Sequence, residues 1–146
     1  MKKIITALAL ALVAVGATAA LAGPIEDRQA IMKQMAGPMK IAVGLTRATA
    51  PYDAAAAKKA MDEIVAHTEK FQTLFPAGTG PGNGIKTQAT AAVWSDAAGF
   101  KAANAKFIAD AKAAGAAKDT ASFAAAFKTM QGDCTGCHKV YRGPAS

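Results

Sequence analysis

This sequence of 146 residues has little of several features that would point to particular classes of protein. Aromatic residues make up 6% of it, and its basic residues are spread out rather than gathered in a patch, so nucleic-acid binding is not expected. Runs of β-branched residues are absent, which argues against a β-sheet. No internal repeat is present either, and we expect a single folded domain.

Cysteine and histidine are scarce, with two of each. A structural zinc site needs four ligands, and His67 stands far along the chain from the two cysteines, which disfavours zinc. A thioredoxin-like redox pair would need its CxxC motif near a βαβ pattern, and none is present. A redox disulfide and a zinc site stay open only as secondary interpretations of the cysteines.

Both cysteines belong to one motif near the C-terminus, Cys134-Thr135-Gly136-Cys137-His138. CxxCH is the attachment motif of covalent c-type haem, in which two thiols add to the haem vinyl groups and the histidine ligates the iron. On a helix, positions i, i+3 and i+4 share one face, so the three side chains would point the same way. The sequence therefore predicts one haem c, attached through Cys134 and Cys137, with His138 bound to the iron.

The N-terminus has the pattern of a secretory signal peptide. Two lysines precede an apolar run that ends near Ala19, and Ala20-Leu21-Ala22 forms a cleavage site. The run is barely long enough to span a membrane, and no cysteine follows the cleavage site for a lipid anchor. We expect residues 1–22 to be removed and residues 23–146 to form a soluble periplasmic domain, outside the membrane where c-type haem is attached.

The mature chain is predicted to be all-α, because alanine is abundant and glycine and proline gather in a few places. Four helices are expected, over about residues 24–48, 53–74 and 96–114, and from about residue 119 through the CxxCH motif. Gly37-Pro38 interrupts the first, so we expect a kink or two shorter helices that meet at Pro38. Gly115 is expected to end the third helix as a C′ residue. The longest loop, residues 76–90, is expected to wrap over one end of the helices.

The last helix carries a regular series of large or sulfur-bearing residues: Phe123, Phe127, Met130, Cys134, Cys137 and Tyr141. Their spacing is heptad-like, which is typical of a helix packed in a bundle. We therefore expect the haem to replace core side chains near the end of this helix.

A four-helix chain with CxxCH near its C-terminus, rather than its N-terminus, resembles the class II cytochromes c, the family of cytochrome c′. The similarity extends along the mature chain, through residues 28–32, 50–53, 75–79, 92–100 and 134–142. The position of CxxCH, together with the segment around Trp94, points to this class. The resemblance implies an antiparallel up-and-down four-helix bundle.

The resemblance also assigns roles around the haem. Arg142 stands where the family keeps a basic residue near the proximal imidazole, and Arg28 matches an arginine often placed close to the haem propionates. Met32 matches the distal position that faces the iron. Two departures lie nearby, since Asp27 replaces the family's usual tyrosine and Pro38 lies within the first helix.

The role of Met32 stays open at this point. In low-spin members of the family a methionine from the first helix ligates the iron, whereas in high-spin cytochrome c′ an apolar residue blocks the sixth position without binding. Met35 and Met39 are predicted near the same pocket, and all three methionines are alternatively flexible core residues. His67 falls on the opposite side of its helix from the apolar stripe and is expected at the surface.

Two functions follow from the resemblance. The first is single-electron transfer in the periplasm. Removal of Lys2 and Lys3 with the signal peptide leaves 15 basic and 10 acidic residues, and this mildly basic surface suits an acidic redox partner of the electron-transport chain. The second is binding of NO or CO at a five-coordinate haem. An enzyme such as a peroxidase is not expected, because the predicted distal face offers only Met, Ile and Ala. The family often pairs through its first two helices, and the Ala-rich faces permit such a homodimer.

Overall fold

The computed structural model describes residues 23–47, 49–82 and 84–144. The predicted signal peptide, residues 1–22, lies outside the described residues. The helices of the described part are α1 (Pro24–Gln34), α2 (Ala36–Leu45), α3 (Ala54–Phe71), α4 (Ala92–Ser95), α5 (Ala97–Gly115) and α6 (Thr120–Tyr141). Within that part the only β-structure is two isolated bridges, so the all-α prediction is confirmed.

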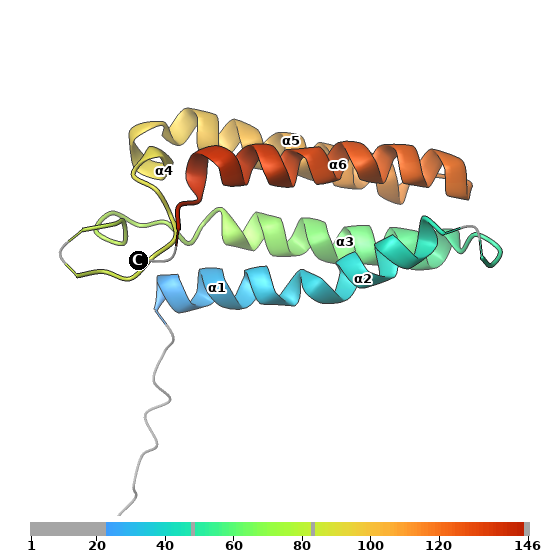
Figure 1. Cartoon of the computed structure of the whole chain (residues 1–146), viewed down its shortest axis with the longest axis horizontal. Helices are drawn as coiled ribbons and strands as arrows, with labels where there is room; N and C mark the ends of the chain where they lie inside the picture. Colours follow the sequence, from blue (N-terminus) through green and yellow to red (C-terminus); the bar gives the residue numbers. More distant parts are fainter. Residues whose placement is uncertain (1–22, 48, 83, 145–146) are drawn as a thin grey trace, which may run out of the picture.

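The long helices form an antiparallel bundle in which the chain changes direction from each rod to the next (Figure 1). α1 and α2 follow one another along one rod, α3 returns beside them, and α5 and α6 form the second pair. The loop after α3 lies at one end of the bundle, close to the end of α6. The predicted up-and-down four-helix bundle is therefore confirmed, and the long loop lies where it was expected.

The first rod is divided at Met35 rather than at Pro38. α1 ends at Gln34, whose carbonyl is the one that the ring of Pro38 would meet in a continuous helix. Because proline clashes with that carbonyl and has no N–H to donate to it, the break falls one turn before the proline. The Met39 N–H donates to the Met35 carbonyl at 3.1 Å, so α2 runs on through Pro38. Two shorter helices were correctly expected, but their meeting point was predicted wrongly.

Acidic side chains fix the starts of the other three long helices. Asp53 and Asp96 each accept a hydrogen bond from the backbone N–H three residues later, at 2.9 and 3.1 Å. Asp119 forms a reciprocal capping box with Ser122 at the start of α6. A cap of this kind typically contributes about 1 kcal/mol, which explains why these starts were predictable from local sequence.

The core fills the half of the bundle that contains the connection between α5 and α6. Phe123 is fully buried there and stacks on Phe127, with 5.6 Å between the ring centroids. Met61 and Ile64 of α3 are also fully buried. The large side chains of the core are thus concentrated at the start of α6, and the opposite half of the bundle, where α6 ends, is left for the site.

Gly115 is the last residue of α5, but its role differs from the one that its sequence context suggests. Among the described glycines only Gly78, Gly82 and Gly84 have a positive φ, so Gly115 is not a left-handed C′ residue and that prediction was wrong. A Cβ atom on Gly115 would lie 3.0 Å from the Cβ of Met61 on α3. The glycine therefore allows α5 and α3 to approach closely.

We expect Gly115→Ala to gain none of the stability that alanine normally brings to a helix, because the added methyl group must displace Met61 in a filled core. Gly132→Ala is the matched control, since Gly132 lies inside α6 with open space around its Cβ position. That control should raise the free energy of unfolding by about 0.5–1 kcal/mol. Urea unfolding compares the two, and an equal gain for Gly115→Ala would contradict the close approach.

Candidate functional site

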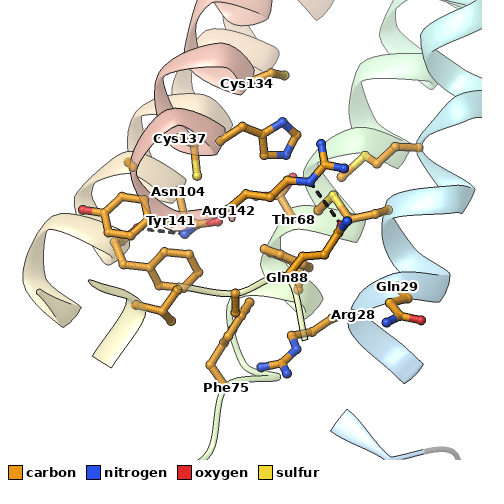
Figure 2. Close-up of a pocket in the computed structure, with 18 of the residues that line it drawn as sticks. Arg28, Gln29, Thr68, Phe75, Gln88, Asn104, Cys134, Cys137, Tyr141 and Arg142 are labelled. Carbon is orange, nitrogen blue, oxygen red and sulfur yellow. Dashed lines mark hydrogen bonds between the residues drawn. The ribbon is translucent and has the colours of Figure 1, made fainter. Parts of the chain in front are cut away.

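A cavity of about 680 Å³ opens at the end of the bundle where α6 finishes, and Figure 2 shows it in close-up. Its volume lies within the range of about 300–1,000 Å³ that is typical of ligand and cofactor sites. All six helices, α1 to α6, and residues 86–89 of the long loop contribute to its walls. Most of the lining is apolar, as in Ile25, Phe71, Val93 and Phe107.

The last turns of α6 bring Cys134, Cys137 and His138 to this cavity. Both cysteines are half-buried and have free thiols. Burial raises the pKa of both thiols, and the Asp133 carboxylate raises the pKa of Cys134 further. The thiols are therefore neutral at pH 7. Within the described residues, no group of three or more His, Cys, Asp or Glu side chains could hold a metal ion.

The imidazole of His138 lies near a cation that follows it by one turn. The backbone N–H of Arg142 donates to the His138 carbonyl at 3.2 Å. Burial lowers the pKa of His138, and the positive charge of Arg142 lowers it further. The imidazole is therefore neutral at pH 7, which is the form that ligates a metal.

Arg142 is held at the cavity by the long loop, whose residues 87–90 lie antiparallel to the residues that follow α6. The Gly143 N–H donates to the Gln88 carbonyl at 2.7 Å, and the Thr90 N–H donates to the Tyr141 carbonyl at 3.0 Å. The Arg142 Nε–H donates to the side-chain oxygen of Gln88 at 3.2 Å, as Figure 2 shows. Gln88 therefore positions the Arg142 side chain, a role that no sequence pattern indicated.

Arg28 of α1 is a buried cation at the cavity wall, with 5% of its surface exposed. Its guanidinium donates to the Thr79 carbonyl at 3.0 Å and to the Thr87 hydroxyl at 3.3 Å, and it lies 4.5 Å from the centre of the Phe75 ring. Burial lowers the pKa of Arg28. In the described part of the chain none of the ion pairs includes it. The Glu26 carboxylate acts on Arg28 only from a distance, by partly offsetting the fall of its pKa. Because a buried cation without a close counter-ion is unfavourable, an anionic group in the cavity would be stabilised here.

An aromatic cluster closes the cavity on the side of α4 and the long loop. The Phe75 ring centroid lies 4.8 Å from that of Phe100 and 6.0 Å from that of Trp94, and Phe100 lies 5.2 Å from Tyr141. The Tyr141 hydroxyl donates to the Asp96 carboxylate at 2.8 Å, which joins the end of α6 to the start of α5. These rings form a largely apolar wall on that side of the cavity.

The rod formed by α1 and α2 provides another wall, and three methionines lie on it. Met32 is 38% exposed, whereas Met35 and Met39 are half-buried, and all three line the cavity. The structure thus brings the predicted distal residue, Met32, into the same cavity as His138. It also brings in the two alternatives that the sequence left open.

Other residues of the cavity differ from the sequence-based expectation. Gln29 and Lys33 also line it, so the expectation of only Met, Ile and Ala on the distal face was wrong. No histidine or carboxylate from the described residues of α1 or α2 is part of the lining. Asp133 lines the cavity and was missed, because a charged residue before a CxxCH motif carries no pattern of its own. His67 is half-buried on α3 and is not among the lining residues.

Comparison with known proteins shows which family has this arrangement of helices and this motif. The sequence model of the family described as Cytochrome C' matches residues 23–142. This chain belongs to the cytochrome c′ family. Cytochrome c-556 of Agrobacterium fabrum is 37% identical to it over 123 residues, which are 83% of this chain and 82% of that protein.

Solved structures of cytochrome c′ agree with the assignment. That of cytochrome c′ from Rhodopseudomonas palustris has a TM-score of 0.73 and 34% identity, and covers 86% of this chain and 99% of its own. A nitric oxide complex of a mutant cytochrome c prime from Alcaligenes xylosoxidans has a TM-score of 0.71 and 29% identity, and covers 84% of this chain and 98% of its own.

The protein is therefore a c-type cytochrome with covalently bound haem c. The cavity fits this cofactor, because it is largely apolar, presents two thiols and a neutral imidazole, and contains the buried cation Arg28. Cytochromes of this family carry electrons or bind gases and are not classical enzymes. No helix in the described part of the chain is long and apolar enough to cross a membrane.

Proposed function

We propose that this cytochrome is a periplasmic single-electron carrier whose haem is attached through Cys134 and Cys137, with His138 and Met32 as axial ligands. The observation that carries the proposal is that Met32 on α1 and His138 on α6 line the same cavity as the two thiols. A bound haem c supplies an iron that accepts and releases one electron, and a methionine ligand raises its reduction potential.

The other residues of the cavity bind and shield the cofactor in this proposal. Arg28 provides the positive charge for the haem propionates, and its hydrogen bonds to Thr79 and Thr87 hold the guanidinium in place. Arg142, positioned by Gln88, acts on the proximal imidazole through its charge. The aromatic cluster excludes water, which limits the reorganisation that accompanies a change of charge in the site.

The proposal includes the location of the protein and its partners. Residues 1–22 act as a cleavable signal peptide that directs the protein to the periplasm. Lys33 and Lys86 are exposed residues at the cavity, and their charges favour an acidic redox partner. The resemblance implies a homodimer that pairs through the rod formed by α1 and α2. Ile41 on α2 is 47% exposed and offers an apolar contact on that rod.

Binding of NO or CO is the second candidate function, and the exposure of Met32 favours it. A methionine that is 38% exposed is not locked by packing, so it can remain unbound and leave the sixth position open. A mutant of the cytochrome c prime from Alcaligenes xylosoxidans, which this chain resembles, forms a nitric oxide complex.

Visible absorption spectra of the haem-loaded protein separate the two candidates. The spectra are recorded in the oxidised and reduced states, with and without CO. For an electron carrier with a methionine ligand, we expect sharp, split reduced bands that CO does not change. Broad high-spin bands that change on adding CO would overturn the methionine ligand and make gas binding the function.

Met32→Ala is expected to make a CO-insensitive reduced haem sensitive to CO and to lower its reduction potential, because the sixth ligand is lost. Met39→Ala is the matched control, since Met39 lines the same cavity from α2 and should leave the spectrum unchanged. CO titration of both variants measures the effect. Opening of the site by Met39→Ala instead would show that the ligand was assigned to the wrong methionine.

A further inference from the structure

An acidic side chain of α6 lies at the cavity wall, directly before the first cysteine of the motif. Asp133 lines the cavity, and its side chain is 12% exposed. Its Oδ1 accepts a hydrogen bond from the Lys106 ammonium on α5. Its Oδ2 is the only buried side-chain oxygen or nitrogen of the described residues that has no hydrogen-bond partner. The Asp133 carboxylate therefore has one close cationic partner, and it also acts on the Asp110 carboxyl, whose pKa it helps to lower.

Lys106 does not neutralise this carboxylate completely. The same ammonium also pairs with Asp110, one turn further along α5, at 2.7 Å. One ammonium thus pairs with two acidic side chains. The charge of Asp133 reaches the attachment site, since it is one of the causes that raise the pKa of the Cys134 thiol.

We propose that Asp133 and Lys106 form a charge pair that tunes the reduction potential of this cytochrome, with Asp133 lowering it and Lys106 raising it. The proposal rests on the proposed attachment of haem at Cys134. A negative charge at the cavity stabilises the oxidised site, which is more positive by one unit, relative to the reduced one. Because Asp133 is largely buried, solvent and salt screen its charge less than they screen that of a surface carboxylate. Charges and hydrogen bonds around a haem are among the means by which a protein tunes it.

The test is the midpoint potential of charge-neutralising variants, measured by spectroelectrochemistry. Asp133→Asn keeps the size of the side chain and removes its charge. At a fixed potential near the midpoint, it should lower the ratio of oxidised to reduced protein about threefold, which is a rise of about 30 mV for a one-electron couple. Lys106→Gln should shift the potential the other way by less, because Lys106 is 60% exposed and well screened. Lys106→Arg keeps the charge and should leave the potential unchanged.

A second ion pair of this chain provides the matched control. Lys58 and Asp62 form an i,i+4 pair on α3 at 2.6 Å, with both side chains exposed and neither lining the cavity. Asp62→Asn and Lys58→Gln should therefore leave the potential unchanged. Covalent haem content after denaturation is measured on every variant, because it tests the attachment independently of the potential.

The possible outcomes distinguish the proposed charge pair from the proposed attachment of haem through Cys134 and Cys137. If Asp133→Asn has the same potential as the Asp62→Asn control while haem stays attached, the charge pair is refuted and the proposed attachment stands. A shift of the same sign in Asp133→Asn and Lys106→Gln would also refute it, since opposite charges must act in opposite directions. Loss of haem from the unmodified protein on denaturation would refute the proposed attachment instead. Should Asp133→Asn fail to fold, the exposed Lys106 variants decide the question.

Discussion

His138→Ala is expected to abolish the native axial ligation while the haem stays covalently attached. Cys134 and Cys137 are unchanged in this variant, so the cofactor should remain on the chain after denaturation. The visible spectra of both oxidation states should change, because the cavity loses its neutral imidazole. The free energy of unfolding should fall by more than the ~1 kcal/mol of an average substitution, since the link between α6 and the cofactor is broken. Absorption spectra and denaturant unfolding measure both effects.

His67→Ala is the control for this experiment. His67 is the other histidine of the chain, lies half-buried on α3 and is not among the residues that line the cavity, so its removal should leave the spectra unchanged. Free imidazole added to His138→Ala should restore part of the native spectrum, because the space of the lost ring is open to it. Unchanged spectra in His138→Ala would show that His138 is not an axial ligand. Altered spectra in His67→Ala would indicate that His67 on α3 affects the haem.

Phe123→Ala should lower the free energy of unfolding by about 3–5 kcal/mol and leave the haem spectrum unchanged. Phe123 is fully buried between the helices, and its ring packs against Phe127 and Tyr52. It does not line the cavity, so the site should keep its geometry in the folded variant. Domains are stable by only about 5–15 kcal/mol, so the loss is a large fraction of the total. Urea unfolding and the visible spectrum are measured on the same sample.

Phe123→Leu separates loss of volume from loss of the ring. Leucine fills most of the space, so the free energy of unfolding should fall by less than about 1.5 kcal/mol. An equal loss in Phe123→Ala and Phe123→Leu would mean that the surrounding helices collapse around the smaller residue. A changed spectrum in either variant would mean that the core and the cavity are coupled.

The helices and their starts were predictable because local signals specify them. Asp53 and Asp119 accept hydrogen bonds from backbone groups three residues away, and such contacts can be seen in the sequence itself. The break in the first rod was predictable only in part. Pro38 indicated that a break exists, but its position at Met35 follows from the clash one turn earlier. Gly115 was misinterpreted, since a close approach to Met61 of another helix leaves no local signal.

The candidate site was also predictable only in part. The spacing of Cys134, Cys137 and His138 by itself places them on one face of a helix, so the motif was sufficient to name them. The partner of Arg142 was not predictable, because Gln88 lies 54 positions away in an irregular loop. The Lys106 contact to Asp133 joins residues 27 positions apart on two helices, and periodicity does not report which side chains meet.

The sequence by itself determined that this chain is an all-α bundle with a haem-attachment motif near the end of its last helix, because apolar periodicity, caps and the CxxCH spacing are properties of neighbouring residues. Only the tertiary structure decided what surrounds that motif. It brought Met32 into the same cavity as His138. It buried Arg28 without an ion pair and left one side-chain oxygen of Asp133 without a hydrogen bond. These features depend on how separate helices and the long loop pack, and burial and charge pairing exist only once those segments have met.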